Sequence, residues 1–103
     1  MLIKLLEICE EITHVEKAES YKKLYFIREI VINSDFIVSM KSDLALEKRM
    51  HENPNSFDGL NKNEKFTRIC MNKGSISNDI VVIGSLEQVF KLLDINNKKV
   101  IKG

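Results

Sequence analysis

Two arginines within apolar segments are the side chains best suited to bind a charged ligand. Arg28 follows Phe26 by two positions and Arg68 follows Phe66 by two, in runs rich in β-branched and aromatic residues. Residues two apart lie on one face of a strand, so each guanidinium would lie beside an aromatic ring. Such a pair can bind an anion, a base or a partner's carboxylate. In the structural alternative, each arginine pairs with a glutamate of the sheet, such as Glu29, or extends to the sheet edge.

The remaining reactive side chains lack the spacing of a catalytic or metal site. His14 and His51 have glutamate neighbours but no His or Cys at a ligand spacing, which favours solvated surface histidines. Cys9 and Cys70 lie in apolar runs without a nucleophile motif, so we expect free, buried and inert thiols. The glycines are too dispersed to form a phosphate-binding loop. The sequence therefore predicts a protein that is not an enzyme and has no metal or cofactor.

Length and charge restrict the class of protein further. A chain of 103 residues forms a single small domain, and 44% apolar residues is typical of a globular protein. Sixteen Lys and Arg against fifteen Asp and Glu give a net charge of +1, which argues against nucleic-acid binding through a basic surface. No apolar run reaches the roughly 20 residues of a membrane span, and residues 1–9 lack the features of a signal peptide. These observations predict a cytoplasmic protein without membrane contact.

The N-terminal part is predicted to be mainly strand. Residues 1–8 fit a helix as well as a strand, and the strand is preferred, whereas residues 11–22 fit a hairpin loop or a helix end. Residues 23–33 are the clearest strand. Because both faces of this strand are largely apolar, we expect a second subunit to cover one of them. Asn33-Ser34-Asp35 then predicts a turn, and Phe36–Met40 a short strand.

A polar insertion separates the two apolar parts of the chain. Asp43 precedes a short predicted helix that ends before Pro54. The polar segment 52–65 is longer than a hairpin needs, and its Phe57 and Leu60 make it a candidate contact surface. The alternative is a surface loop without a role.

The C-terminal part predicts a hairpin followed by a helix. Strands are expected at 66–72 and 80–83, joined through a turn at Asn72-Lys73-Gly74-Ser75. Ser85 and Gln88 have the spacing of a capping box for a helix over residues 85–93. Four apolar residues form one stripe of this helix, which should lie on the sheet: Leu86, Val89, Phe90 and Leu93.

Residues 28–40, 67–75 and 80–93 follow a recurrent order: strand, Asn-x-Asp turn, strand; strand, Asn-x-Gly turn, strand; then a capped helix. This order is similar to that of small FlbD/SwrD-type flagellar proteins and of many small phage and mobile-element proteins. The resemblance covers about half of the chain and implies a meandering antiparallel sheet with a helix packed on it, but no catalytic residues. The insertion 41–65 departs from the compact flagellar pattern. The composition, rich in Lys, Asn and Ile, fits an AT-rich phage or Firmicute genome.

The expected fold is therefore α+β, with four or five antiparallel strands, a C-terminal helix packed on the sheet and a short helix in the insertion. Residues 1–93 would form the single domain, and residues 94–103 a basic, flexible tail.

The leading functional prediction is a non-enzymatic regulator or inhibitor of phage or mobile-element type that binds a protein partner stoichiometrically in the (host) cytoplasm. The alternative is a small-ligand or nucleotide-binding protein with a site at a subunit interface. A nucleic-acid-binding regulator is the third possibility. Homo-oligomers are expected, because so small a chain has a limited core. The candidate partner-binding or ligand-binding residues are Phe26, Arg28, Phe57, Leu60, Phe66, Arg68 and Asn72.

Overall fold

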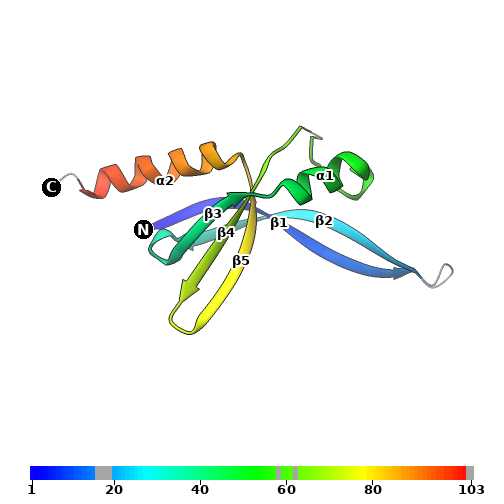
Figure 1. Ribbon diagram of the computed structural model, residues 1–103, viewed down its shortest axis with the longest axis horizontal. Coiled ribbons are helices and arrows are strands. Elements are labelled where there is room, and N and C mark those ends of the chain that lie inside the picture. The colour runs from blue at the N-terminus through cyan, green and yellow to red at the C-terminus, as the bar shows by residue number, and fades with distance from the viewer. Residues whose placement is uncertain (16–19, 58, 62, 102–103) are drawn as a thin grey trace.

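The computed structural model describes residues 1–15, 20–57, 59–61 and 63–101. Its strands form one five-stranded antiparallel sheet in the order β2-β1-β5-β4-β3 (Figure 1). The elements are β1 (Leu2–Val15), β2 (Ser20–Asn33), the short 3-10 helix η2 (Ser34–Phe36), β3 (Ile37–Ser42), α1 (Leu44–Glu52), the short 3-10 helix η3 (Pro54–Ser56), β4 (Phe66–Lys73), β5 (Ile76–Ile83) and α2 (Leu86–Ile101). The predicted α+β class and antiparallel sheet are confirmed.

The strands β1 and β2 form the longest hairpin of the molecule. Their register is continuous from Leu2 opposite Asn33 to Val15 opposite Ser20. The N-terminal segment is therefore a strand, and it runs further than predicted. Residues 11–15 and 20–22 pair across the hairpin instead of forming a loop or a helix end, because cross-strand partners outweigh the weak local preference of a charged segment. Residues 16–19 of that prediction lie outside the described residues.

One face of the sheet, here called the α2 face, is covered by the C-terminal helix. Alternate residues of a strand point to opposite faces, and Ile3 and Leu5 of β1 point to this one. They join residues of β2, β4 and β5 in an apolar core with Val89 and Leu93 of α2. The buried sheet residues of this core are Ile3, Leu5, Ile32, Ile69, Ile80 and Val82.

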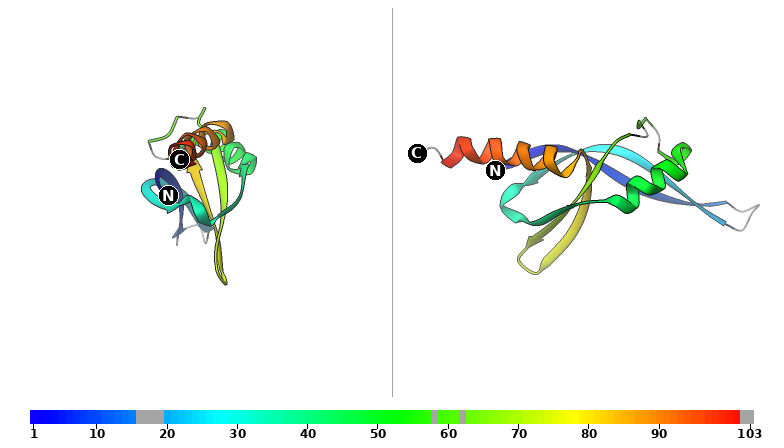
Figure 2. Two further views of the ribbon diagram at one scale, coloured as in Figure 1. Left: turned by 90° about the vertical axis from the view of Figure 1, so that its left-hand side faces the viewer. Right: turned by 45° about the horizontal axis from the view of Figure 1, so that its top comes forward.

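The opposite face, here called the α1 face, holds a second core. Ile8 and Tyr25 from the β1–β2 hairpin and Phe66 from β4 pack against Leu46 and Met50 of α1. Phe57, from the segment after η3, completes this cluster. The two helices thus cover opposite faces, and they lie toward opposite ends of the long axis, which measures 62 Å (Figure 1). Figure 2 also shows the β1–β2 hairpin extending past α1 and the β4–β5 hairpin projecting from the body.

The helix starts follow the local signals of the sequence. Asp43 caps α1, because its carboxylate accepts the Leu46 backbone N–H at 3.0 Å. At α2 the predicted capping box is present: the Ser85 hydroxyl accepts the Gln88 N–H at 3.1 Å, and the Gln88 amide oxygen accepts the Ser85 N–H at 2.9 Å.

The end of α2 differs from the prediction. The helix continues past Leu93 to Ile101, so residues 94–101 of the expected flexible tail are helical. Residues 102–103 lie outside the described residues. Because no glycine or proline interrupts residues 94–101, nothing in the local sequence stops the helix there.

Candidate functional site

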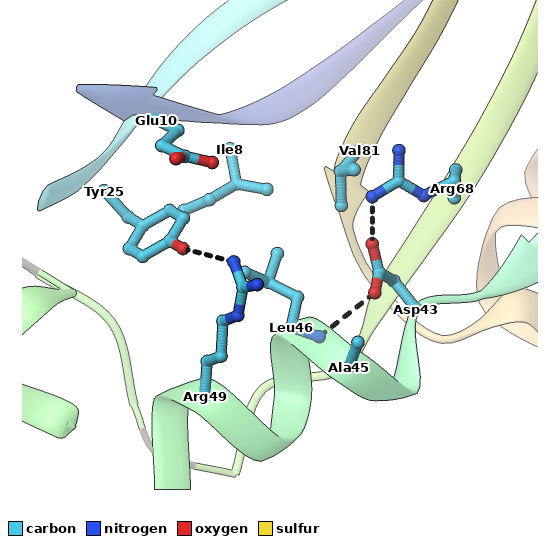
Figure 3. Close-up of a pocket in the computed structure, with 9 residues that line it drawn as sticks. All are labelled: Ile8, Glu10, Tyr25, Asp43, Ala45, Leu46, Arg49, Arg68 and Val81. Atoms are coloured by element: carbon cyan, nitrogen blue, oxygen red, sulfur yellow. Dashed lines mark hydrogen bonds and ion pairs between the residues drawn. The ribbon is translucent and has the colours of Figure 1, made fainter. Parts of the chain in front are cut away.

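A small polar pocket lies between α1 and the α1 face of the sheet (Figure 3). Its volume is about 160 Å³, smaller than the roughly 300–1,000 Å³ of typical small-molecule sites. Four apolar residues, Ile8, Ala45, Leu46 and Val81, form part of its lining. The polar lining consists of Glu10, Tyr25, Asp43, Arg49 and Arg68.

On one side of this pocket, Arg49 connects α1 to the β1–β2 hairpin. Its guanidinium donates a hydrogen bond to the Tyr25 hydroxyl at 3.1 Å (Figure 3). This hydrogen bond, with the negative charges of Glu10 and Asp43 nearby, raises the pKa of Arg49 above its ordinary value. The arginine therefore stays charged and links the helix to the sheet.

On the other side of the pocket, Arg68 is held by two carboxylates. It donates to Asp43 at 2.8 Å and lies 3.7 Å from Asp79 on β5. The same Asp43 carboxylate caps α1, so one side chain both starts the helix and fixes the arginine. Because Arg49 is bound to Tyr25, and Arg68 to Asp43 and Asp79, we interpret the pocket as the polar attachment of α1 to the sheet.

The sequence predicted a partner for Arg28 within the sheet, and the structure provides one, although it is Glu7 and not Glu29. Arg28 donates to the Glu7 carboxylate at 2.9 Å across the β1–β2 ladder, which raises the pKa of Arg28. Glu29 instead pairs with Lys4 at 2.9 Å.

Both cysteines are free and half-buried. Burial, followed by the nearby negative charge of Glu7, raises the pKa of the Cys9 thiol. A raised pKa reduces the thiolate fraction at neutral pH, which makes this sulfur a poor nucleophile.

The structure does not assemble the predicted arginine-aromatic site. Arg28 and Phe26 lie on the α2 face, whereas Arg68 and Phe66 lie on the α1 face, as the strand registers require. Phe66 is fully buried in the second core, so its ring cannot stack on a ligand. Phe26 is 40% exposed, and Asn72 is exposed near the β4–β5 turn, away from both arginines in the register.

The predicted contact residues of the polar insertion are core residues instead. Phe57 is only 4% exposed, and Leu60 is half-buried against the same cluster. The insertion packs on the α1 face, because an aromatic ring next to apolar surface gains more from burial than from solvent exposure. The interpretation of Phe57 as an exposed contact residue is therefore wrong.

An apolar groove lies where α2 runs beside the edge strand β3. One part, of about 540 Å³, is lined by Met40, Leu86, Glu87 and Phe90. The adjoining part, of about 300 Å³, shares Met40 and Phe90 and is also lined by Ser34, Ile37, Leu93 and Asp94. Phe90 is 59% exposed, although it belongs to the stripe predicted to lie on the sheet.

The groove was not identified from the sequence, but its signal was present. The apolar stripe of α2 has four members, of which only Val89 and Leu93 are buried in the core. Leu86 and Phe90 are left on the flank of the helix that meets Met40. A stripe wider than its contact with the sheet leaves apolar side chains for another surface.

Two kinds of feature are absent from the described residues. They contain no group of three or more His, Cys, Asp or Glu side chains placed to hold a metal ion. In the same part of the chain, no helix is long and apolar enough to cross a membrane.

Comparison with protein-family models, with curated proteins and with solved structures gave no match to this chain.

Proposed function

We propose that this protein is a non-enzymatic regulator or inhibitor that acts by stoichiometric binding to a protein partner. The observation that supports the proposal is the apolar groove between α2 and β3, in which Phe90 is 59% exposed beside Met40 and Leu86. Exposed apolar surfaces of this kind mark interaction sites in water-soluble proteins.

The form of the groove favours a polypeptide over a small molecule. Its two parts join along one side of a helix and an edge strand, as an extended depression. Small-molecule sites usually enclose most of the ligand in one cavity. A free cysteine on each of two different strands, Cys9 and Cys70, supports a reducing cytoplasm as the place where binding occurs.

The proposal can be tested by selecting ligands for the groove. A yeast-displayed library of random dodecapeptides is sorted for binding to the wild-type protein, and the enriched peptides are then measured against Phe90→Glu. We expect Phe90→Glu to weaken binding by at least about tenfold, because it places a charge in the apolar contact.

The matched control is Leu44→Glu, which changes another exposed apolar residue on a different helix; Leu44 is 70% exposed. It should leave the affinities unchanged, and both variants should keep the wild-type melting temperature. Peptides that bind Phe90→Glu as tightly as the wild type, or a library that yields no binders, would contradict the proposed function.

A further inference from the structure

The strand that borders the groove has a free edge. β3 is the last strand of the sheet and pairs with β4 on its inner side only. Within the described ranges, no strand pairs with its outer side. An edge strand presents a row of backbone N–H and C=O groups to which another chain can add.

The hydrogen-bond pattern shows which backbone groups of β3 point outward. The Asp43 N–H donates to the Phe66 carbonyl of β4 at 2.9 Å, so the backbone N–H and C=O groups of Asp43 point toward β4. In an antiparallel ladder, the side to which a residue's backbone N–H and C=O groups point alternates from one residue to the next. The backbone groups of Lys41 therefore also point inward, toward β4, whereas those of Met40 and Ser42 point outward, to the free edge.

An independent contact on the other side of β4 agrees with this assignment. The Gly84 N–H donates to the Lys65 carbonyl at 2.8 Å. By the same alternation, the backbone N–H and C=O groups of Thr67 and Ile69 point toward β5. These are the residues opposite Ser42 and Met40 in the β3–β4 register. Each such pair therefore has its backbone groups directed away from the other strand.

The side chain of Met40 links this edge to the groove. It lines both parts of the groove and thus points to the α2 face. Directly opposed residues of neighbouring strands point to the same face. A residue that hydrogen-bonds to the Met40 backbone therefore places its own side chain in the groove, beside Leu86 and Phe90.

The lining of the groove favours apolar residues on such a strand. Its lining includes two carboxylates, of which Glu87 already forms an ion pair with Lys91 of the same helix at 3.2 Å. The remaining lining residues are neutral. An extended segment that crosses the groove is therefore best matched by apolar side chains at the positions that face the groove.

We propose that the occupant of the groove is an extended segment of the partner protein, which adds to β3 as a sixth strand. It hydrogen-bonds to the backbones of Met40 and Ser42 and inserts alternate apolar side chains between β3 and α2. This inference rests on the proposed function and specifies the partner's conformation and chemistry.

The probe for this test is the acetylated and amidated peptide Lys-Val-Thr-Ile-Thr-Val-Lys. Amide hydrogen exchange of the full chain is measured by NMR with and without it. We expect the amides of Met40 and Ser42 to become protected by at least about tenfold at saturation, while the Lys41 amide, already bonded to β4, changes little.

Two modified probes separate strand addition from simple apolar contact. N-methylation of the central Ile removes the N–H that faces β3 and should weaken binding by at least about tenfold, whereas N-methylation of an adjacent Thr, whose N–H points away, should not. The two Lys side chains of the probe lie on the same face as its Thr residues, away from the groove, so a probe with Glu in place of both Lys should bind with nearly unchanged affinity.

Three results would overturn the inference. Binding without protection of the Met40 and Ser42 amides would show an occupant that is not a strand. Absence of probe binding, together with Phe90-dependent library binders, would refute an extended apolar occupant while leaving the protein-binding function intact. Protection of both amides in the free protein that increases with its concentration would identify the occupant as a second copy of the chain.

Discussion

The ring of Phe57 stacks on the ring of Tyr25, with centroids 4.3 Å apart and planes inclined by only 7°. The same two residues form an isolated parallel β-bridge, so the polar insertion is attached to β2 through both backbone and side chain. The Tyr25 hydroxyl also accepts a hydrogen bond from Arg49 of α1. One contact therefore joins the insertion, the β1–β2 hairpin and α1.

Phe57→Ala is expected to lower the free energy of unfolding by about 3–5 kcal/mol, because it leaves a cavity in the second core. Urea denaturation monitored by circular dichroism measures the change. The control, Asn55→Ala, alters an exposed residue of the same segment and should change stability by less than about 0.5 kcal/mol. Equal effects of the two substitutions would show that Phe57 does not anchor the insertion.

Ser85→Ala is expected to cost roughly 0.5–2 kcal/mol of stability, because the Gln88 N–H loses its side-chain acceptor at the start of α2. The shift of the urea midpoint reports this loss. Ser39→Ala, at an exposed position of β3, serves as the comparison and should leave the midpoint nearly unchanged. An unchanged midpoint for Ser85→Ala would mean that the cap contributes nothing to α2.

The alkylation rate of Cys9 should increase at a higher pH than that of an ordinary thiol, because burial and the charge of Glu7 raise the pKa of the Cys9 thiol. In a Cys70→Ala background, Glu7→Gln removes the negative charge and leaves Arg28 beside the sulfur. This change lowers the pKa and should accelerate reaction with iodoacetamide at pH 8. A pH–rate profile unaffected by Glu7→Gln would assign the raised pKa to burial alone.

A homodimer is expected through the part of the α1 face that α1 leaves uncovered. There, Leu2, Leu6 and Val31 are 72%, 45% and 59% exposed, and they surround the Lys4–Glu29 ion pair at 2.9 Å. A patch with both charges and apolar groups is complementary to a second copy of itself related by a two-fold axis.

Light scattering at tens of micromolar should therefore report a dimer for the wild type and a monomer for Val31→Lys. Val38→Lys is the control, because Val38 is 64% exposed on β3, at the other edge of the sheet. A monomeric wild type would refute the dimer. Dissociation by Val38→Lys, with no effect of Val31→Lys, would place the interface on β3.

Sequence reasoning succeeded where the determining contacts are local. The cap of α2 joins residues three positions apart, and Asp43 caps α1 over the same distance. These bonds depend on the identity of neighbouring residues alone, so the pattern predicts them. The strand over residues 23–33 was identified for a similar reason, since its β-branched and aromatic residues are contiguous.

The relation between the two arginines shows why the candidate site could not be predicted. Alternation fixes which residues share a face within one strand, and it placed Phe26 with Arg28 correctly. The relation between strands depends on register, and the pairs Glu7–Val82 and Arg68–Val81 direct Arg28 and Arg68 to opposite faces. A shift of one residue would have reversed the result. The burial of Phe57 depends likewise on Tyr25, a partner far away in the sequence.

The pairing of Glu7 with Val82 has a consequence for how the chain acquires its structure. It joins β1 to β5, which are separated along the chain by β2, β3, α1 and β4, so the centre of the sheet closes only after all of these segments have been made. The β1–β2 hairpin forms from neighbouring segments and can pair early during synthesis, whereas β5 leaves the ribosome only after β3, α1 and β4. Closure of so long a loop is entropically costly and slows folding. During this interval the inner edge of β1 is exposed, which makes the nascent chain most open to aggregation or to capture by a chaperone before β5 arrives.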